Sequence, residues 1–115
     1  MLKFFFLLWV LLASSFVHAQ TPMVRLAPLG YQQLTSTGLI NLTVPTGATV
    51  ALITVETTSV RWRDDGTAPT ASVGNLLGVT GAGLPFTYTG NLSVLQFIPT
   101  ASTSIVNVTY YRFAG

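Results

Sequence analysis

Residues 49–57, with the sequence TVALITVET, decide the fold class. Successive side chains of an extended chain point to opposite faces, and both faces of this stretch carry apolar, mostly β-branched residues. One face has Val50, Leu52 and Thr54, and the other has Ala51, Ile53 and Val55. The pattern predicts a strand that is buried inside a β-sandwich.

Further stretches of strand character follow at intervals of roughly 8 to 12 residues, and Gly, Pro, Asn and Asp lie between them. Outside residues 1–19, no window has helical spacing with caps. The stretches cover residues 39–44, 60–64, 86–89, 92–98 and 104–112, and residues 30–36 add an edge strand. The sequence therefore predicts an all-β domain of about seven short strands, arranged as a small antiparallel β-sandwich or jelly-roll-like barrel.

The N-terminus has the three parts of a secretory signal peptide. A basic start, MLK, precedes the apolar run FFFLLWVLL, residues 4–12, and the small-x-small pattern VHA precedes Gln20. We expect cleavage between Ala19 and Gln20, with residues 1–19 as signal peptide and residues 20–115 as a single all-β domain. The apolar run is shorter than the ~20 residues that span a bilayer, so the leader is the only membrane contact that we expect. A start codon placed upstream of a cytoplasmic protein is the alternative.

Charge is scarce in this chain, since 7% of its 115 residues are charged, against about a quarter in a typical domain. Without the leader, four arginines oppose three acids, a net charge of 4 − 3 = +1. Nucleic acid binding needs a patch of several Lys or Arg, whereas three of these four arginines lie near acids or at the end of the chain. We therefore expect no nucleic acid partner. A net charge near zero favours association, so we expect homo-oligomers.

The residues outside the leader lack His, Cys and Lys. This excludes Ser-His and Cys-His nucleophile pairs, Schiff-base lysine chemistry and zinc sites built from imidazole or thiolate. Glu56 with Asp64 or Asp65 is the remaining acid-base candidate. In an extended chain, however, Asp64 and Asp65 point to opposite faces, nearby arginines lower a carboxyl pKa, and the spacing matches no EF-hand calcium loop. The sequence predicts a noncatalytic protein without a cofactor or a metal site.

Residues 60–74, VRWRDDGTAPTASVG, concentrate charge in a chain that otherwise avoids it. Asp65-Gly66 is a turn dipeptide, in which the Asp carboxylate accepts hydrogen bonds from backbone amides two residues on. Pro69 then restricts a long loop that leaves the strand after this turn. Trp62 is expected in the core.

The arginines lie at the base of this loop. Arg61 and Arg63 point to one face of the predicted strand. We expect one of them to pair with Asp64 or Glu56 across neighbouring strands, through charge-assisted hydrogen bonds. Such pairs would hold the base of the loop and leave its tip available to a neighbouring subunit or a ligand.

These residues and their flanks resemble a family of small virion proteins from the heads or tails of tailed bacteriophages and prophages. In that family a V-R-W/Y-R-D-D-G-x-x-P-T-x-x-x-G run precedes strands with Y-x-G-x-L, F-I and N-V-x-Y-Y-R patterns. The resemblance covers residues 50–112 and implies an all-β, multi-copy structural component without catalysis. The shared motif residues are Arg61, Trp62, Arg63, Asp64, Asp65, Gly66, Pro69, Thr70 and Gly74, followed at the end by Tyr110, Tyr111 and Arg112.

The leader departs from this resemblance, because phage structural proteins assemble in the cytoplasm. Three explanations remain open: an exported protein has borrowed the module, a virion component passes through a membrane, or the leader results from a misplaced start codon. We expect a noncatalytic structural subunit that is periplasmic or secreted, or part of a virion. Its expected partners are further copies of itself, or other virion or surface proteins.

A binding module is the competing function. Trp62, Tyr88, Tyr110 and Tyr111, with Arg112, would then offer a surface to a carbohydrate or a cell-surface ligand. Clustering of these rings on one exposed face would favour binding, whereas burial of most of them would favour assembly.

Overall fold

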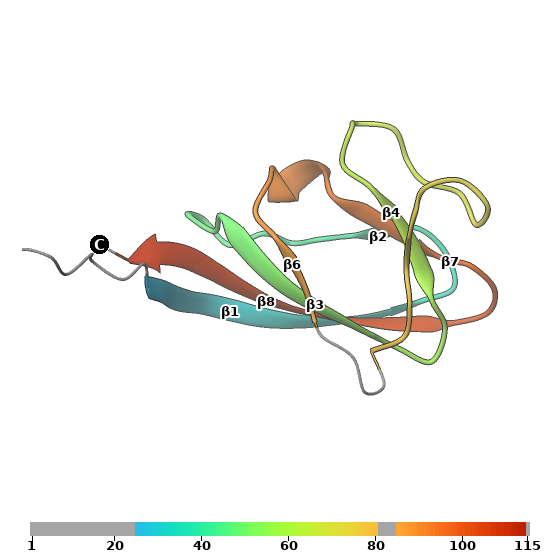
Figure 1. Cartoon of the computed structure of the whole chain (residues 1–115), viewed down its shortest axis with the longest axis horizontal. Helices are drawn as coiled ribbons and strands as arrows, with labels where there is room; N and C mark the ends of the chain where they lie inside the picture. Colours follow the sequence, from blue (N-terminus) through green and yellow to red (C-terminus); the bar gives the residue numbers. More distant parts are fainter. Residues whose placement is uncertain (1–24, 81–84, 115) are drawn as a thin grey trace, which may run out of the picture.

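Eight β-strands and one short 3₁₀-helix form the part of the chain that the structure, a computed structural model, describes, residues 25–80 and 85–114 (Figure 1). The strands make two four-stranded sheets that pack together around one core. The predicted signal peptide and its cleavage site between Ala19 and Gln20 lie outside the described residues. The elements are β1 (Arg25–Ser36), β2 (Ile40–Asn41), β3 (Val50–Glu56), β4 (Val60–Arg63), β5 (Asn75–Leu77), β6 (Phe86–Tyr88), η1 (Leu92–Val94), β7 (Gln96–Pro99) and β8 (Ser104–Ala114).

The strand order identifies a jelly roll. One sheet, the β1 sheet, has the order β1-β8-β3-β6, and the other, the β2 sheet, has the order β2-β7-β4-β5. The first strand pairs with the last, the second with the seventh, the third with the sixth and the fourth with the fifth, all antiparallel. Such nested pairing is that of an eight-stranded jelly roll made of two sheets. The predicted all-β, jelly-roll-like sandwich is confirmed.

The core lies between the two sheets, and β3 and β8 supply its centre. Ile53 and Val55 of β3 pair with Val108 and Val106 of β8, and all four side chains are fully buried. Phe97 of β7 is fully buried as well and belongs to the same cluster. Burial of each such side chain contributes roughly 1.5–3 kcal/mol relative to exposure, so apolar packing between the sheets holds the fold together.

The expectation that both faces of β3 are buried holds only in part, since Val50 is buried on the outer face but the next two residues of that face are not. Leu52 and Thr54 are half-buried, because they alternate with the core residues and point to the outer face of the β1 sheet. Leu52 lies opposite Thr109 on one side and Thr87 on the other, so this outer face is rich in threonine. β-branched side chains suit an exposed strand surface as well as a buried one, which explains the error.

The predicted strand over residues 92–98 is a strand only in its second half. Its first half forms η1, since the Asn91 side chain accepts a hydrogen bond from the Ser93 amide at 3.2 Å and caps the helix. Strand pairing begins at Gln96. β5 was not predicted at all, because three residues are too few to show alternation, and its pairing with β4 defines it.

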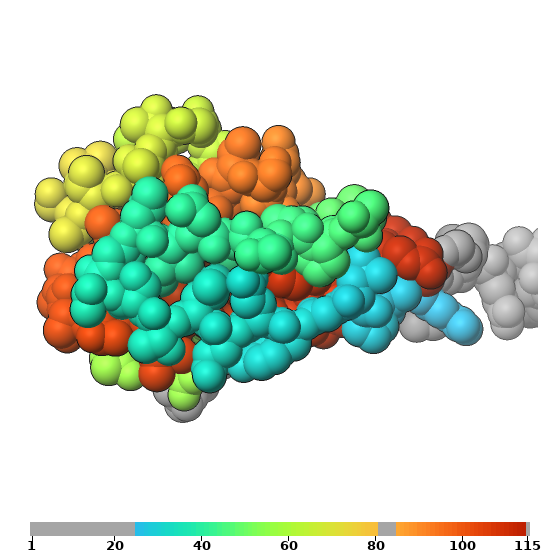
Figure 2. All heavy atoms as spheres, turned by 180° about the vertical axis from the view of Figure 1, so that it is seen from behind, coloured from blue at the N-terminus to red at the C-terminus, as the bar shows by residue number. Residues whose placement is uncertain are grey.

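β1 begins at Arg25, before the predicted edge strand over residues 30–36, and pairs with β8 along its length. β3 stops pairing with β8 at Tyr111, so β1 and β8 continue past it as a two-stranded ribbon. We call residues 25–28 and 111–114 the ribbon end. Figure 1 shows the ribbon projecting from one side of the sandwich, and Figure 2 shows it from behind.

Candidate functional site

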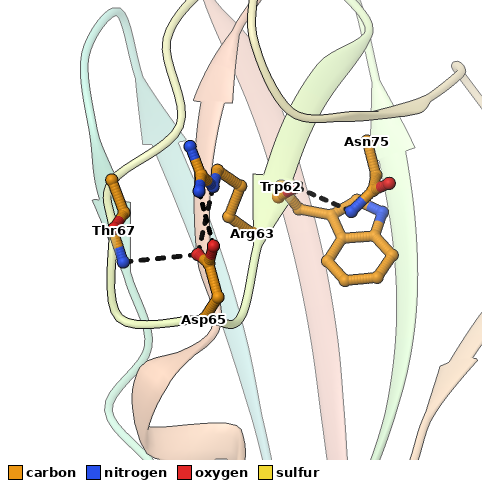
Figure 3. A network of polar contacts seen from close by, with 5 residues as sticks. All are labelled: Trp62, Arg63, Asp65, Thr67 and Asn75. Carbon is orange, nitrogen blue, oxygen red and sulfur yellow. Dashed lines mark hydrogen bonds and ion pairs between the residues drawn. The ribbon is translucent and has the colours of Figure 1, made fainter.

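The charged motif forms β4 and the following residues 64–74, which we call the motif loop. Val60 is buried and Trp62 packs against the core, so Arg61 and Arg63 lie on the opposite, outer face of the β2 sheet. Figure 3 shows Trp62 and Arg63 on opposite sides of the strand. Trp62 was expected inside the core, but it is only half-buried because it lies at the last-but-one position of a short strand.

Arg61 binds the far half of the motif loop. Its Nε donates to the Ala71 carbonyl at 3.1 Å, and its Nη1 donates to the Gly74 carbonyl at 2.9 Å. The expected ion pair with Glu56 or Asp64 was wrong for this arginine, because the strand register places Arg61 between Leu76 and Ile98. Arg61 therefore holds the loop through backbone carbonyls.

Arg63 binds the near half of the motif loop. Its Nε donates to Asp65 Oδ1 at 3.0 Å, and its Nη2 donates to the other carboxylate oxygen (Figure 3). The expectation of an ion pair across neighbouring strands was wrong for Arg63, because its partner Asp65 lies in the turn that directly follows it. Because Arg63 donates to this carboxylate, the pKa of Asp65 is below its ordinary value.

The Asp65-Gly66 turn is confirmed. The Thr67 amide donates to Asp65 Oδ1 at 3.3 Å, which is the predicted bond to an amide two residues on (Figure 3). Gly66 has φ +87°, a conformation that side chains rarely adopt. The dipeptide thus sets the direction in which the chain leaves β4.

Pro69 and Gly74 lie close together and so stabilise the second half of the motif loop. Pro69 is buried, and a Cβ atom at Gly74 would lie 3.1 Å from Pro69 Cβ and 3.3 Å from the Trp62 carbonyl. Gly74 also has φ +137°. Between them, the Thr70 amide donates to the Val73 carbonyl at 2.9 Å, and the Val73 amide donates to Thr70 Oγ1 at 3.0 Å. The spacing P-T-x-x-x-G therefore encodes one compact turn that needs glycine at its end.

Asp64 has a different partner from its neighbour Asp65. The Tyr88 hydroxyl donates to Asp64 Oδ2 at 2.6 Å and so connects β6 of the β1 sheet to the end of β4 in the β2 sheet. Burial, with a smaller contribution from Asp64, raises the pKa of Tyr88 to about 12. Tyr88, Phe86 and Trp62 pack together, with ring centroids 5.2 to 6.4 Å apart. The rings fill the space between the two sheets beside the motif loop.

The expected aromatic ligand surface is not assembled by the fold. Tyr88 and Tyr110 are buried, and the Tyr110 hydroxyl donates to Gln32 Oε1 at 2.8 Å inside the sandwich. Tyr111 is half-buried on the outer face of the β1 sheet, and the exposed Arg112 lies in the ribbon end. These side chains therefore point in different directions and do not form one exposed face with Trp62.

Sequence reasoning missed a more exposed ring, Tyr31, on the outer face of the β1 sheet. Its side chain is 62% exposed, and its hydroxyl donates to Asn107 Oδ1 at 2.6 Å. Gln33 also donates to Asn107 Oδ1, and Asn107 Nδ2 donates to a carboxylate oxygen of Glu56 at 2.8 Å. The alternation of Tyr31 and Gln33 in one strand was the available signal, but their shared partner Asn107 comes from β8, and the partner of Asn107, Glu56, comes from β3.

The Arg63–Asp65 pair gives the first prediction. Asp65→Ala removes the acceptor of the Thr67 amide and of Arg63, so we expect faster hydrogen exchange at Thr67 and a weaker assembly. The sheets should keep their circular dichroism spectrum, because the pair is exposed and lies outside the core. Thr67→Ala, which keeps the amide, is the matched control. An unchanged oligomer mass in Asp65→Ala would contradict the expected link between loop and assembly.

Within residues 25–80 and 85–114, no group of three or more His, Cys, Asp or Glu side chains is placed to hold a metal ion. The same residues contain no helix with the length and apolar character needed to cross a membrane. Comparisons with protein-family models, curated proteins and solved structures found no match to this chain.

Proposed function

We propose that this protein is a noncatalytic structural subunit that is exported, acts in several copies and shares ancestry with phage virion proteins. The main support for this proposal is the motif loop, which is held in one conformation and exposes apolar side chains. Hydrogen bonds of Arg61 and Asp65 and the close approach of Pro69 to Gly74 hold the loop in one conformation. Val73 within the loop and Leu76 just after it are 53% and 62% exposed. A loop already held in one conformation loses little entropy on binding, so it is suited to contact another protein through these apolar side chains.

The polar groups of the loop support a structural role and not catalysis. Asp64 accepts a hydrogen bond from Tyr88, and Asp65 accepts from Arg63 and from the Thr67 amide. A general acid needs a carboxyl group with a raised pKa, whereas the pKa of Asp65 is lowered. The two carboxylates thus stabilise the loop.

The jelly roll supports a virion-type ancestry by analogy. This architecture occurs in viral capsid domains and also in lectin domains. Fold alone does not assign a function, so the analogy adds weight only together with the motif resemblance over residues 50–112. Export is proposed from the leader sequence.

A carbohydrate-binding or surface-binding module is the second candidate, and Tyr31 is the observation that favours it. The exposed ring, fixed by Asn107 and flanked by Gln33, offers a stacking surface with amide groups at its edge. Binding of an oligosaccharide that is lost in Tyr31→Ala would support this candidate. A glycan array with no signal for the wild-type protein would remove it.

The mass of the wild-type protein in solution tests the proposed function. The full chain is expressed with its leader and purified from the compartment where it accumulates, and intact-mass spectrometry shows whether it begins at Gln20. Light scattering after size exclusion should then give a multiple of the chain mass, which is 12.3 kDa before any cleavage. A monomer at all accessible concentrations would contradict the structural-subunit proposal.

A further inference from the structure

The ribbon end combines exposed apolar side chains with unpaired positive charge. Leu26 and Phe113 lie directly opposite each other in the β1–β8 pairing, and they are 45% and 54% exposed. Arg25 and Arg112 are exposed in the same segment, and among the described residues neither forms an ion pair with an acidic side chain. Among the residues that the structure describes, no other strand pairs with this segment beyond Tyr111, and it projects past β3 (Figures 1 and 2).

The opposite end of the β1 sheet has a negative charge and an exposed apolar side chain, which complement the arginines and the apolar side chains of the ribbon end. Glu56, the last residue of β3, is exposed and accepts a hydrogen bond from Asn107, but it has no arginine partner among the described residues. The Thr80 amide donates to the Val55 carbonyl at 2.8 Å, which brings the neighbouring Val79 to this end of β3. Val79 is 48% exposed. We call Glu56 and Val79 the acceptor end, because they place an exposed apolar side chain and a carboxylate without an arginine partner at the same end of β3.

The two ends cannot meet within one molecule. Glu56 lies opposite Ile105, and Arg112 lies seven positions further along the same strand β8. At ~3.3 Å per residue, the strand separates them by roughly 23 Å. Contact between two ribbon ends of different copies is also unfavourable, since it would gather four guanidinium groups, and residues 25–28 and 111–114 contain no acidic side chain.

We propose that the ribbon end of one copy docks on the acceptor end of a second copy. Leu26 and Phe113 pack on Val79, and Arg112 or Arg25 pairs with Glu56. The contact joins two different surfaces, so each copy keeps one free ribbon end and one free acceptor end, and the assembly grows as a ring or a filament. The inference rests on the proposed multi-copy function and names one of its contacts.

Charge variants test the contact, with the dissociation constant measured by light scattering over a concentration series. Glu56→Gln keeps the hydrogen bond from Asn107 and should weaken association about tenfold, and Glu56→Arg or Arg112→Glu about a hundredfold. Combining Arg112→Glu with Glu56→Arg in one chain should restore association to within about tenfold of wild type, because the charges remain complementary. Thr87→Glu, which changes the charge on the exposed edge strand β6 away from both ends, is the matched control and should leave association unchanged.

Mixing one-sided variants tests whether the contact is head to tail. Arg112→Glu/Phe113→Ser and Glu56→Arg/Val79→Ser should each associate less than wild type, and an equimolar mixture should regain association through the intact ends. Thermal unfolding verifies that both variants are folded, which we expect because all four side chains are exposed.

Several results would overturn the inference while leaving the multi-copy function in place. These are a wild-type oligomer that none of the variants affects, loss of association in the Arg112 variant but not in the Glu56 variant, and no recovery on mixing. A monomeric wild-type protein would overturn both the proposed function and the inference. A monomer that binds vesicles of phosphatidylserine through Phe113 would assign the ribbon end to a lipid surface and overturn the inference.

Discussion

The protein should lose roughly a third or more of its stability when the pH is raised from 10 to 12. Tyr88 and Tyr110 are the cause, since burial raises the pKa of each to about 12, compared with 10.0 for an exposed tyrosine. A group whose pKa is raised in the folded state contributes its full stability below the pKa of the unfolded state. That contribution disappears as the pH rises through the folded pKa.

The expected loss is large relative to the total. At about 1.4 kcal/mol per pKa unit, the two tyrosines together account for roughly 5 kcal/mol by pH 12. Domains of this kind have a total stability of about 5–15 kcal/mol. Ionised Tyr88 would in addition lie next to the carboxylate of Asp64, to which its hydroxyl now donates. Urea unfolding at pH 8, 10, 11 and 12 measures the loss.

Phenylalanine variants separate the two tyrosines. Tyr88→Phe and Tyr110→Phe each remove one group that must ionise, at the cost of a hydrogen bond to Asp64 or to Gln32. Each variant should be less stable than wild type at pH 8 by about 1 kcal/mol but less sensitive between pH 10 and 12. The double variant should lose little stability over that interval. The same alkaline loss in the double variant as in wild type would show that other groups cause it.

Replacing Gly74 with valine should destabilise the protein by about 3 kcal/mol and detach the motif loop from β4. The backbone at φ +137° disfavours any side chain, and the added Cβ would lie 3.1 to 3.3 Å from Pro69, Arg61 and the Trp62 carbonyl. The chain must move away to relieve these contacts. That movement separates the Gly74 carbonyl from Arg61, which donates to it at 2.9 Å.

Gly78→Ala is the matched control for this variant. A Cβ atom at Gly78 would have no neighbour within 4 Å, so the change in stability should stay within about 0.5 kcal/mol. The measurement is thermal unfolding, in which 3 kcal/mol corresponds to a fall of roughly 12–24 °C for a domain of about this size. Hydrogen exchange at Val73 should accelerate in Gly74→Val alone. Equal melting temperatures for the two variants would contradict the close packing of Pro69 on Gly74.

Part of the candidate site was predictable because its interactions are local. The Asp65-Gly66 turn forms between neighbours in the chain, and its bond to the Thr67 amide follows from the dipeptide itself. The partner of Arg61 was not predictable, because its choice between carbonyls and carboxylates depends on the register of β4 against β5 and β7. The Tyr88–Asp64 bond was missed for the same reason, since it joins two sheets.

The sequence by itself determined the all-β class, the position of most strands and the turn after β4, since alternation and turn residues act over a few positions. The tertiary structure alone decided which face of β3 is covered, where β5 forms and that Tyr88 and Tyr110 are buried. It also decided that the ribbon end and Glu56 lie at opposite ends of one sheet. The physical reason is that strand pairing and layer packing join residues from distant parts of the chain, and short-range pattern carries no information about them.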